Sequence, residues 1–528
     1  MQIPFQGPCA TAATIGFQPA VNRRSVSSTS LFRGAIAVAL VASTAALPWV
    51  TTAAHTPAAG RSFRTAPAVT QVRSLGMRSS PKLGNEPLAF VVHPTHPPVS
   101  LDWPTALRLA GGRLADWREI DGGGRPLHLV LGPAAASRLF GVWLLLGTVP
   151  AGVRLGATEQ AAAQIVAGDP DAAGLVAGEG LSPAVRAATL DGVDPVRDPA
   201  HYRLLVPGAA PETVTTAIAF GDIMTSRTVD KKMVALNDFL SPFRSVGPAL
   251  AAADLAFGNF EGTISHDARP QPGGTRFVSR IKAIDGFRFA GLDFLSLANN
   301  HIGDYGAGTL RETVALLRGA GIAVAGAGAD LAGAREPAVV VRNGVRFGFV
   351  SFNAIIGTPE ATPNSAGAER IEMAPWFPFS AQDLARVVED VRTARKKADV
   401  VIVFPHWGQE YTARPNADQV RVAHALIDAG ADMLIATHPH WVQGAEIYKG
   451  HLIAYSLGNF VFDQTWSVET QQGAALQLVW WGHRLVSASF VPVQIEDAHR
   501  PRFVSDQAGA AILARIWGAS GEPYVRAS

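Results

Sequence analysis

Short apolar runs that each end in polar residues recur between residues 216 and 460 of this 528-residue chain. Runs of this kind, rich in β-branched and other apolar side chains, predict buried strands. The predicted strands are 216–220, 254–257, 294–297, 400–404, 433–436 and 452–456, and helical patterns between them span 307–319, 381–397 and 418–429. Strands that alternate with helices predict a layered α/β domain, in which ligands bind beyond the carboxyl ends of the strands.

The polar residues at these strand ends are carboxylates, amides and imidazoles. In chain order they are Asp222, Asn259 with Glu261, Asn300 with His301, His406, His438 with His440, and Asn459. Such side chains suit Zn, Mn, Fe or Mg, whereas a thiolate site is excluded because the chain has 1 Cys. We therefore predict a site for one or two divalent metal ions.

His438 and His440 flank Pro439 directly after a predicted strand. In extended backbone, residues two apart share one face, so both imidazoles are expected to point into one crevice. The proline is expected to stiffen this arrangement because its ring fixes φ.

Each cluster also has a purely structural interpretation. A single aspartate after a strand, such as Asp222, is commonly a turn or helix-capping residue. Residues 300–301 can form a capped turn with a surface histidine, and residues 458–459 can form a plain turn, which leaves Asn459 and Asp463 open. The repetition of such clusters at successive strand ends favours the metal site over these local explanations.

Six motifs in this region carry a family resemblance: FGDIM at 220–224, DLAFGNFEG at 254–262, LANNH at 297–301, HWGQEY at 406–411, THPH at 437–440 and YSLGNF at 455–460. They resemble the capsule synthesis CapA family, which includes membrane-bound poly-γ-glutamate biosynthesis proteins. The resemblance covers about residues 214–495 and leaves 496–528 as a C-terminal extension.

The CapA family is in turn similar to calcineurin-like metallophosphoesterases. That resemblance implies a four-layer α-β-β-α sandwich with two metal ions at the strand ends, which would clamp a phosphoryl group between them. It also implies individual roles: Asp222 and His440 on the first ion, Glu261 or Asn259 in the bridging position, Asn300, His406 and His438 on the second ion, and His301 as the group that protonates the leaving group or steadies the phosphate. Met224 stands where the phosphoesterases carry a histidine.

Residues that flank the clusters are candidates for supporting roles. Glu410 and Tyr411 follow His406 closely and are predicted to orient it. Arg276 and Arg280, together with residue 282, follow the Glu261 cluster and are candidates for contact with an anionic polymer or phosphate. Basic side chains in such positions are commonly just solvated.

The first 84 residues have the composition of an export segment. A basic leader at 1–33 precedes an apolar stretch at 34–50, which suits a signal peptide or a membrane anchor. Positive charge before this stretch predicts that the chain after it is exported, either secreted or anchored by one N-terminal span. Residues 51–84 are rich in Ala, Ser, Pro and Arg and predict a flexible linker.

Residues 86–208 form a second, smaller α/β unit, with predicted strands at 87–92 and 127–131 and a predicted helix at 103–115. The motifs ADWREIDGG at 115–123 and GDPDAAGLV at 168–176 resemble the second lobe of periplasmic phosphate-type solute-binding proteins. A complete binding protein closes two lobes on its ligand, so the resemblance implies a partial lobe and not a competent anion trap.

Three functional hypotheses remain open. The first is an exported metal-dependent hydrolase of phosphoesterase type, acting on an anionic cell-envelope polymer or a phosphate ester. The second is a non-catalytic accessory subunit beside the membrane subunits of a poly-γ-glutamate synthase. The third is a metal-dependent amide hydrolase or transpeptidase on the polymer. A net charge of +2, with no basic run interleaved with aromatics, gives no case for nucleic acid as a partner.

Overall fold

The computed structural model describes residues 83–145, 150, 152–211, 213–267 and 274–525. All of them belong to the compact unit Arg78–Ser528. The predicted leader at 1–33 and the predicted signal peptide or anchor at 34–50 lie outside the described residues, as does the predicted linker except for its last two residues, which begin strand β1 (Leu83–Pro87). Within the described ranges, no helix has the length and hydropathy needed to cross a membrane.

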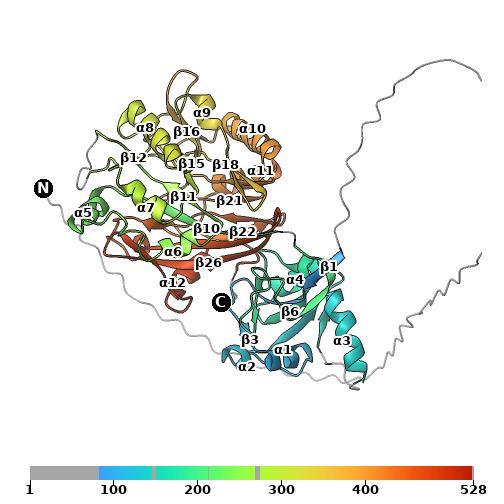
Figure 1. The fold of residues 1–528 in the computed structure, drawn as a ribbon. Helices are drawn as coiled ribbons and strands as arrows, with labels where there is room; N and C mark the ends of the chain where they lie inside the picture. The colour runs from blue at the N-terminus through green and yellow to red at the C-terminus, as the bar shows by residue number, and fades with distance from the viewer. Residues whose placement is uncertain (1–82, 146–149, 151, 212, 268–273, 526–528) are drawn as a thin grey trace, which may run out of the picture. The chain divides into compact units, whose positions relative to one another are not determined.

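Two mixed sheets form the centre of the larger domain, which begins at residue 214 (Figure 1). The first has the strand order β15 (Ala323–Ala325), β14 (Phe294–Ser296), β11 (Leu255–Phe260), β10 (Val214–Ile223), β25 (Gln472–Trp481), β26 (Arg484–Glu496) and β27 (Arg500–Phe503), with β24 (Asn459–Val461) also paired to β10. The second has the order β17 (Ala338–Arg342), β18 (Val345–Val350), β20 (Val400–Val403), β21 (Met433–Ile435), β23 (His451–Ala454) and β22 (Ala445–Tyr448). The strands that carry or precede the predicted site residues are parallel to one another: β10, β11, β14 and β24 in the first sheet, and β20 and β21 in the second. Their carboxyl ends therefore meet at one edge of each sheet.

Alternating side chains on β10 show how the sheets are covered on both faces. Ala217 and Ala219 pack into an apolar cluster between the two sheets, whereas Ile218 and Phe220 point into a second cluster beneath helices. The helices of that second cluster are α5 (Arg227–Ala235), α6 (Gly247–Ala251), α7 (Ala283–Phe289) and α8 (Gly306–Gly319). Helix α12 (Ala510–Trp517) contributes to the cluster between the sheets.

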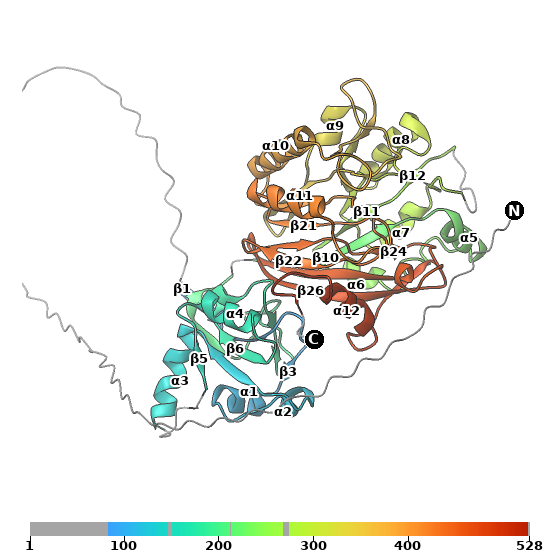
Figure 2. The same ribbon diagram turned by 180° about the vertical axis from the view of Figure 1, so that it is seen from behind.

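A third apolar cluster covers the outer face of the second sheet. It is formed by β20, β21 and two helices that lie side by side, α10 (Ala381–Lys397) and α11 (Ala417–Asp428) (Figure 2). The layers therefore follow the order helix, sheet, sheet, helix. Short pairs complete the domain: β12 (Thr263–Ile264) with β13 (Val278–Ser279), and β16 (Ala327–Gly328) with β19 (Gly367–Ala368), next to α9 (Leu331–Arg335).

The α/β class is confirmed, and each of the predicted strands and helices of this domain is present. The ends of the helices follow from local chemistry. The Ser380 side chain accepts a hydrogen bond from the Asp383 backbone N–H and so caps α10, while Asn416 and Gln419 form a reciprocal capping box at the start of α11.

The smaller domain has a mixed sheet of its own, in the order β5 (Arg154–Leu155), β4 (His128–Leu131), β6 (Ala172–Val176), β2 (Ala89–Val92) and β7 (Arg186–Ala187). Its helices are α1 (Trp103–Ala110), α2 (Arg118–Asp121), α3 (Pro133–Leu145) and α4 (Glu159–Ala167). Its remaining strands form two pairs, β3 (Ser100–Leu101) with β8 (Thr189–Leu190), and β1 with β9 (Leu205–Ala209). The helix predicted at 103–115 was too long. Helix α1 ends at Ala110 because Gly111 caps it and Gly112 takes a left-handed φ of 63°.

A buried glutamate connects three elements of this smaller domain. Glu159, the first residue of α4, accepts hydrogen bonds from the backbone N–H of Ala134 at 2.8 Å and of Ala177 at 2.7 Å. Ala134 lies in the first turn of α3, where free N–H groups make a helix attractive to anions. The Glu159 carboxylate thus satisfies one N–H group at the start of α3 and one directly after β6.

Replacement of Glu159 by Ala is expected to lower the free energy of unfolding by about 2 to 3 kcal/mol, because it leaves two backbone N–H groups without their acceptor. Urea unfolding of the full chain measures this change. Glu119→Ala serves as the control, since Glu119 is half exposed and pairs with Arg108 at the surface. Equal losses in the two variants would contradict the structural role of Glu159.

Candidate metal centre

Three buried polar residues lie next to one another across three strands. The register of the first sheet pairs Asp222 of β10 with Asn259 of β11 on one side and with Asn459 of β24 on the other. The Asn259 side-chain amide donates a hydrogen bond to Asp222 Oδ1 at 2.7 Å. The sheet register therefore fixes Asp222 and the two amides at the carboxyl end of β10.

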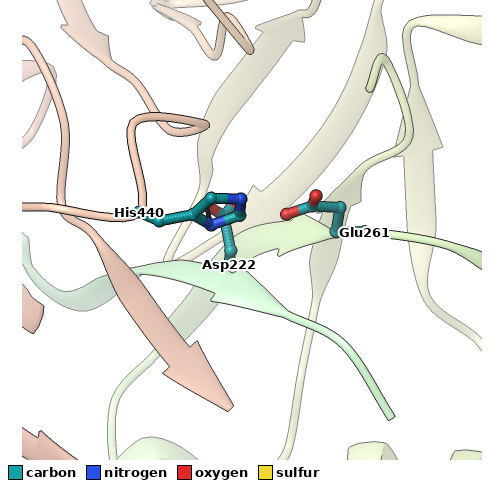
Figure 3. A group of neighbouring side chains, drawn as sticks. All are labelled: Asp222, Glu261 and His440. Carbon is teal, nitrogen blue, oxygen red and sulfur yellow. Dashed lines mark ion pairs between the residues drawn. The ribbon is translucent and has the colours of Figure 1, made fainter. Parts of the chain in front are cut away.

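Glu261 follows directly after β11 and completes a compact group with Asp222 and His440. Its backbone N–H donates to the Ile223 carbonyl at 2.8 Å, which holds it beside β10. One ligand atom from each of Asp222, Glu261 and His440 lies within 4.8 Å of the others. Figure 3 shows the Glu261 carboxylate pointing toward the His440 imidazole, with Asp222 below the ring.

The loop after β21 brings two imidazoles to this group from the second sheet. The His438 backbone N–H donates to Asp222 Oδ2 at 3.2 Å, and His440 Nδ1 lies 2.9 Å from Asn459 Oδ1 and 3.8 Å from Asp222 Oδ2. The prediction of an extended backbone here was wrong. His438 and His440 have φ values of 97° and 56°, so left-handed turns and not an extended strand direct their side chains.

His406 connects Asn300 to the same group. Its Nε2 lies 2.9 Å from Asn300 Oδ1, and its Nδ1 lies 3.0 Å from Thr437 Oγ1 and 3.9 Å from Asp222 Oδ1. The ring centroids of His406 and His438 are 4.8 Å apart. The structure thus gathers the residues predicted as metal ligands into one contiguous cluster, which is buried except for the partly exposed Asn300.

Burial dominates the electrostatics of the cluster. It raises the pKa of Asp222, and it raises the pKa of Glu261 well above its usual range with a further contribution from the Asp222 charge. Burial also lowers the pKa of His406 and His438, and it lowers the pKa of His440 to about 3. Burial therefore favours the neutral form of these three imidazoles.

The polar atoms without partners test whether a metal ion fits. Both carboxylate oxygens of Glu261 and both ring nitrogens of His438 are buried and have no hydrogen-bond partner among the described residues. Buried polar atoms are rarely left unpaired, and unpaired carboxylates and neutral imidazoles are the ligands that divalent ions take. The group Asp222, Glu261 and His440 can bind a metal ion, and His438 presents further donor atoms beside it.

His301 lies at the edge of the cluster and is its more accessible imidazole. Its Nδ1 contacts Asp304 Oδ2 at 2.8 Å, its Nε2 lies 3.7 Å from Glu261 Oε1, and its side chain is 16% exposed. The ring stacks on Phe277 with centroids 3.7 Å apart. Asp304 favours the tautomer with a proton on Nδ1, which leaves Nε2 facing the cluster.

Glu410 and Tyr411 were predicted to orient His406, but they contact a different histidine loop. Glu410 Oε1 is 3.9 Å from His440 Nε2, and the Tyr411 backbone N–H donates to the Pro439 carbonyl, so these residues contact the His440 loop rather than His406. The basic residues predicted as candidates for contact with an anion lie next to other side chains. Arg276 lies over the Tyr305 ring, Arg280 pairs with Asp230, and Lys282 lies over the Phe239 ring.

Several residues of the site went unrecognised in the sequence. Asn299 donates from Nδ2 to Asn259 Oδ1 and to the Phe260 carbonyl, and Thr437 contacts His406, although neither has a distinctive sequence signal. Asp304 could have been found from its position three residues after His301. Arg227, which follows Asp222 by five residues, was also missed.

Comparison with known proteins gives one family. Residues 216–464 match the family described as "Bacterial capsule synthesis protein PGA_cap". The "Capsule biosynthesis protein CapA" of Bacillus anthracis is 32% identical over 288 residues, which cover 53% of this chain and 68% of that protein. The "PGA biosynthesis protein CapA" of Bacillus subtilis is 32% identical over 273 residues, covering 50% and 68%. A "Probable polyglutamine synthesis accessory protein" of Mycobacterium tuberculosis is 37% identical over 171 residues, covering 32% and 44%.

Two solved structures also align with parts of the chain. A hypothetical protein from Thermus thermophilus aligns over 53% of this chain and 100% of its own, with 17% identity and a TM-score of 0.32. An ABC-type phosphate transport receptor from Vibrio cholerae aligns over 25% of this chain and 62% of its own, with 17% identity and a TM-score of 0.18.

Addition of Mn²⁺ or Zn²⁺ to the chelator-treated full chain is expected to raise its melting temperature, because the ion binds the folded cluster and not the unfolded chain. At a concentration of about 100 times Kd the stabilisation is about 2.7 kcal/mol. Scanning calorimetry with metal analysis by plasma mass spectrometry measures the effect. Glu261→Gln and His438→Ala are expected to remove it, and wild-type protein that gains neither metal nor stability would contradict the site.

The affinity for the ion is expected to rise with pH. The raised pKa values of Asp222 and Glu261 mean that protons occupy these carboxylates in the metal-free protein at lower pH, and ion binding must release them. Each proton released makes the binding constant about tenfold larger per pH unit below the relevant pKa. Metal titrations between about pH 5 and about pH 8, where folded proteins tend to be most stable, measure the slope. An affinity that does not change with pH would contradict the expected protonation of the carboxylates.

Proposed function

This chain belongs to the bacterial capsule synthesis protein family PGA_cap, and from this premise we propose that it is a metal-dependent hydrolase of phosphoesterase type that acts in capsule or poly-γ-glutamate synthesis. Its substrate in this proposal is an anionic cell-envelope polymer or a phosphate ester. The observation that carries the proposal is the set of unpaired, buried donor atoms on Glu261 and His438, next to Asp222 and His440.

The proposed metal site uses Asp222, Glu261, His406, His438 and His440 as ligands, while Asn259 and Asn459 hold Asp222 and His440 in position. A divalent ion in this site supplies Lewis-acid activation of a phosphoryl or carbonyl oxygen. The buried surroundings exclude bulk water, which strengthens every electrostatic interaction inside the site.

The proposed acid is His301. Asp304 orients the imidazole ring through Nδ1, and Nε2 faces Glu261. In this proposal Nε2 is the atom that gives a proton to the leaving group. Its partial exposure lets a leaving group reach it, whereas the other histidines of the cluster are fully buried.

The phosphoesterase type is preferred over the amide hydrolase or transpeptidase because of the layer order. Helices cover both sides of two packed sheets, and the cluster lies at the strand ends. This is the arrangement expected from the resemblance to metallophosphoesterases. We also propose that the domain works outside the cell, either secreted or held by one N-terminal span; the basic leader and the apolar stretch at 34–50 support this.

A non-catalytic accessory subunit is the second candidate. The Mycobacterium tuberculosis relative, described as a "Probable polyglutamine synthesis accessory protein", favours it. In this alternative the same cluster binds a structural ion, and the chain assembles with membrane subunits of a poly-γ-glutamate synthase.

Hydrolysis by the metal-loaded full chain decides between the candidates. The panel contains phosphodiesters, phosphomonoesters and γ-glutamyl peptides. His301→Gln is expected to lower kcat by about 10²- to 10⁴-fold, the usual contribution of a general acid, and to leave the metal content unchanged. Asp304→Asn is expected to have a smaller effect in the same direction, because it only orients the ring.

Two results would redirect the assignment. A chain that binds its metal stoichiometrically but hydrolyses none of the panel would favour the accessory subunit. Activity confined to the γ-glutamyl peptides would favour the amide hydrolase or transpeptidase.

A further inference from the structure

Arg227 begins helix α5, directly after the loop that follows Asp222. Its backbone has a φ of 49°, a left-handed conformation that costs an L-residue about 1 to 2 kcal/mol. Such strain is retained where surrounding contacts fix the residue, and it often occurs at binding sites. The contacts of the Arg227 side chain show what holds it.

Asp463 fixes one end of the guanidinium group. Its Oδ1 accepts a hydrogen bond from Arg227 Nη2, and its Oδ2 accepts one from the Thr228 backbone N–H at 3.0 Å. Asp463 therefore both caps the start of α5 and orients the arginine, which resolves the role that its sequence context left open.

Two phenylalanine rings connect Arg227 to the site. The guanidinium carbon lies 4.6 Å from the ring centroid of Phe277 and 5.7 Å from that of Phe462. Phe277 stacks on His301, and the Phe462 ring centroid lies 4.9 Å from that of His440. Arg227 is therefore one ring away from both the proposed acid and a proposed metal ligand.

The guanidinium group of Arg227 has N–H donors that are not used in hydrogen bonds to the described residues. It carries five N–H donors, and its one hydrogen-bond partner among the described residues is Asp463. The buried Nε has no partner within the same part of the chain, and the side chain as a whole is 15% exposed. An arginine held in this way is largely desolvated but still reachable by a ligand.

The charge of Arg227 acts on the residues of the cluster. The guanidinium lies over the Phe277 and Phe462 rings, and these rings in turn contact His301 and His440. Positive potential therefore extends from Arg227 over the space beside the candidate ligands.

We propose that Arg227 binds an oxyanion of the substrate, a carboxylate or a phosphate, beside the metal centre. The planar fork of a guanidinium matches two oxygens of either group, and a bond made in a desolvated site is stronger than one made in water. The proposal rests on the proposed function and narrows its substrate class to molecules with an acidic group next to the bond that is cleaved.

Calorimetric titration of the metal-loaded full chain tests this proposal with two probes, inorganic phosphate and a γ-linked tetraglutamate. Arg227→Gln is expected to weaken binding of the recognised probe by about 10- to 100-fold, the effect of losing a charge-assisted hydrogen-bond pair. Arg227→Lys, which keeps the charge and loses the fork, is expected to fall between wild type and Arg227→Gln. Weakening confined to phosphate identifies a phosphoryl ligand, and weakening confined to tetraglutamate identifies a carboxylate.

A neutral ligand and a distant arginine provide the controls. The methyl ester of the tetraglutamate is expected to bind wild type and Arg227→Gln equally, because it lacks the carboxylates. Arg346→Gln removes the same charge from an ion pair with Asp399 at the opposite ends of the strands, and it is expected to bind like wild type. The double variant Arg227→Gln/Asp463→Asn avoids an unpaired buried aspartate if the single variant fails to fold.

Metal content, measured on every sample, separates this proposal from the one on which it rests. Binding of both probes by Arg227→Gln, or by the double variant, as tightly as by wild type would overturn the role of Arg227, as would a wild-type protein that binds neither probe. If the chain binds the probes through Arg227 but hydrolyses nothing, the oxyanion site is supported and the proposed hydrolase function is contradicted.

Discussion

The carboxylate of Asp222 joins the two sheets at the point where the site is built. One of its oxygens accepts a hydrogen bond from Asn259 on the neighbouring strand, and the other accepts one from the backbone of His438, in a loop that belongs to the second sheet. The group is fully buried, so burial raises its pKa, and a cation beside it would favour its ionised form. The packing of the sandwich and the chemistry of the site thus depend on the same side chain.

The chemistry of the site changes with depth. Asp222 and the imidazoles of His406 and His438 lie at the bottom, where burial keeps the histidines neutral. His301 and Arg227 lie at the edge, both against Phe277, and both are partly exposed. The candidate ion ligands therefore lie inside, and the proposed acid and the proposed oxyanion-binding arginine lie at the more exposed edge.

Much of this architecture could be predicted from the sequence because it is local. Strand β20 and residues 217–220 of β10 are continuous apolar runs, α10 combines an N-terminal Ser380 cap with a basic last turn, and polar clusters follow the strands directly. The pairing of Asp222 with both Asn259 and Asn459 depends instead on strand order, which one sequence does not contain. The backbone conformation of His438 and His440 was also not predicted correctly.

Those misses have specific physical causes. The positive φ angles of His438 and His440 are imposed by tertiary contacts and contradict the extended backbone expected around a proline. Arg227 was overlooked because its contacts with Asp463 and Phe277 come from segments about 236 and 50 residues away in the chain. Interactions of this range leave no periodic signal in the residues themselves.

Glu159 places a negative charge permanently at the start of helix α3 in the smaller domain. In a solute receptor the anion arrives from solution, and its arrival and departure drive opening and closing. Here the negative charge at the start of α3 is covalently part of the chain, so its effective concentration is fixed and it cannot be washed out, competed away or sensed. The backbone N–H groups of Ala134 and Ala177 are therefore satisfied by the chain itself, with no ligand from solution.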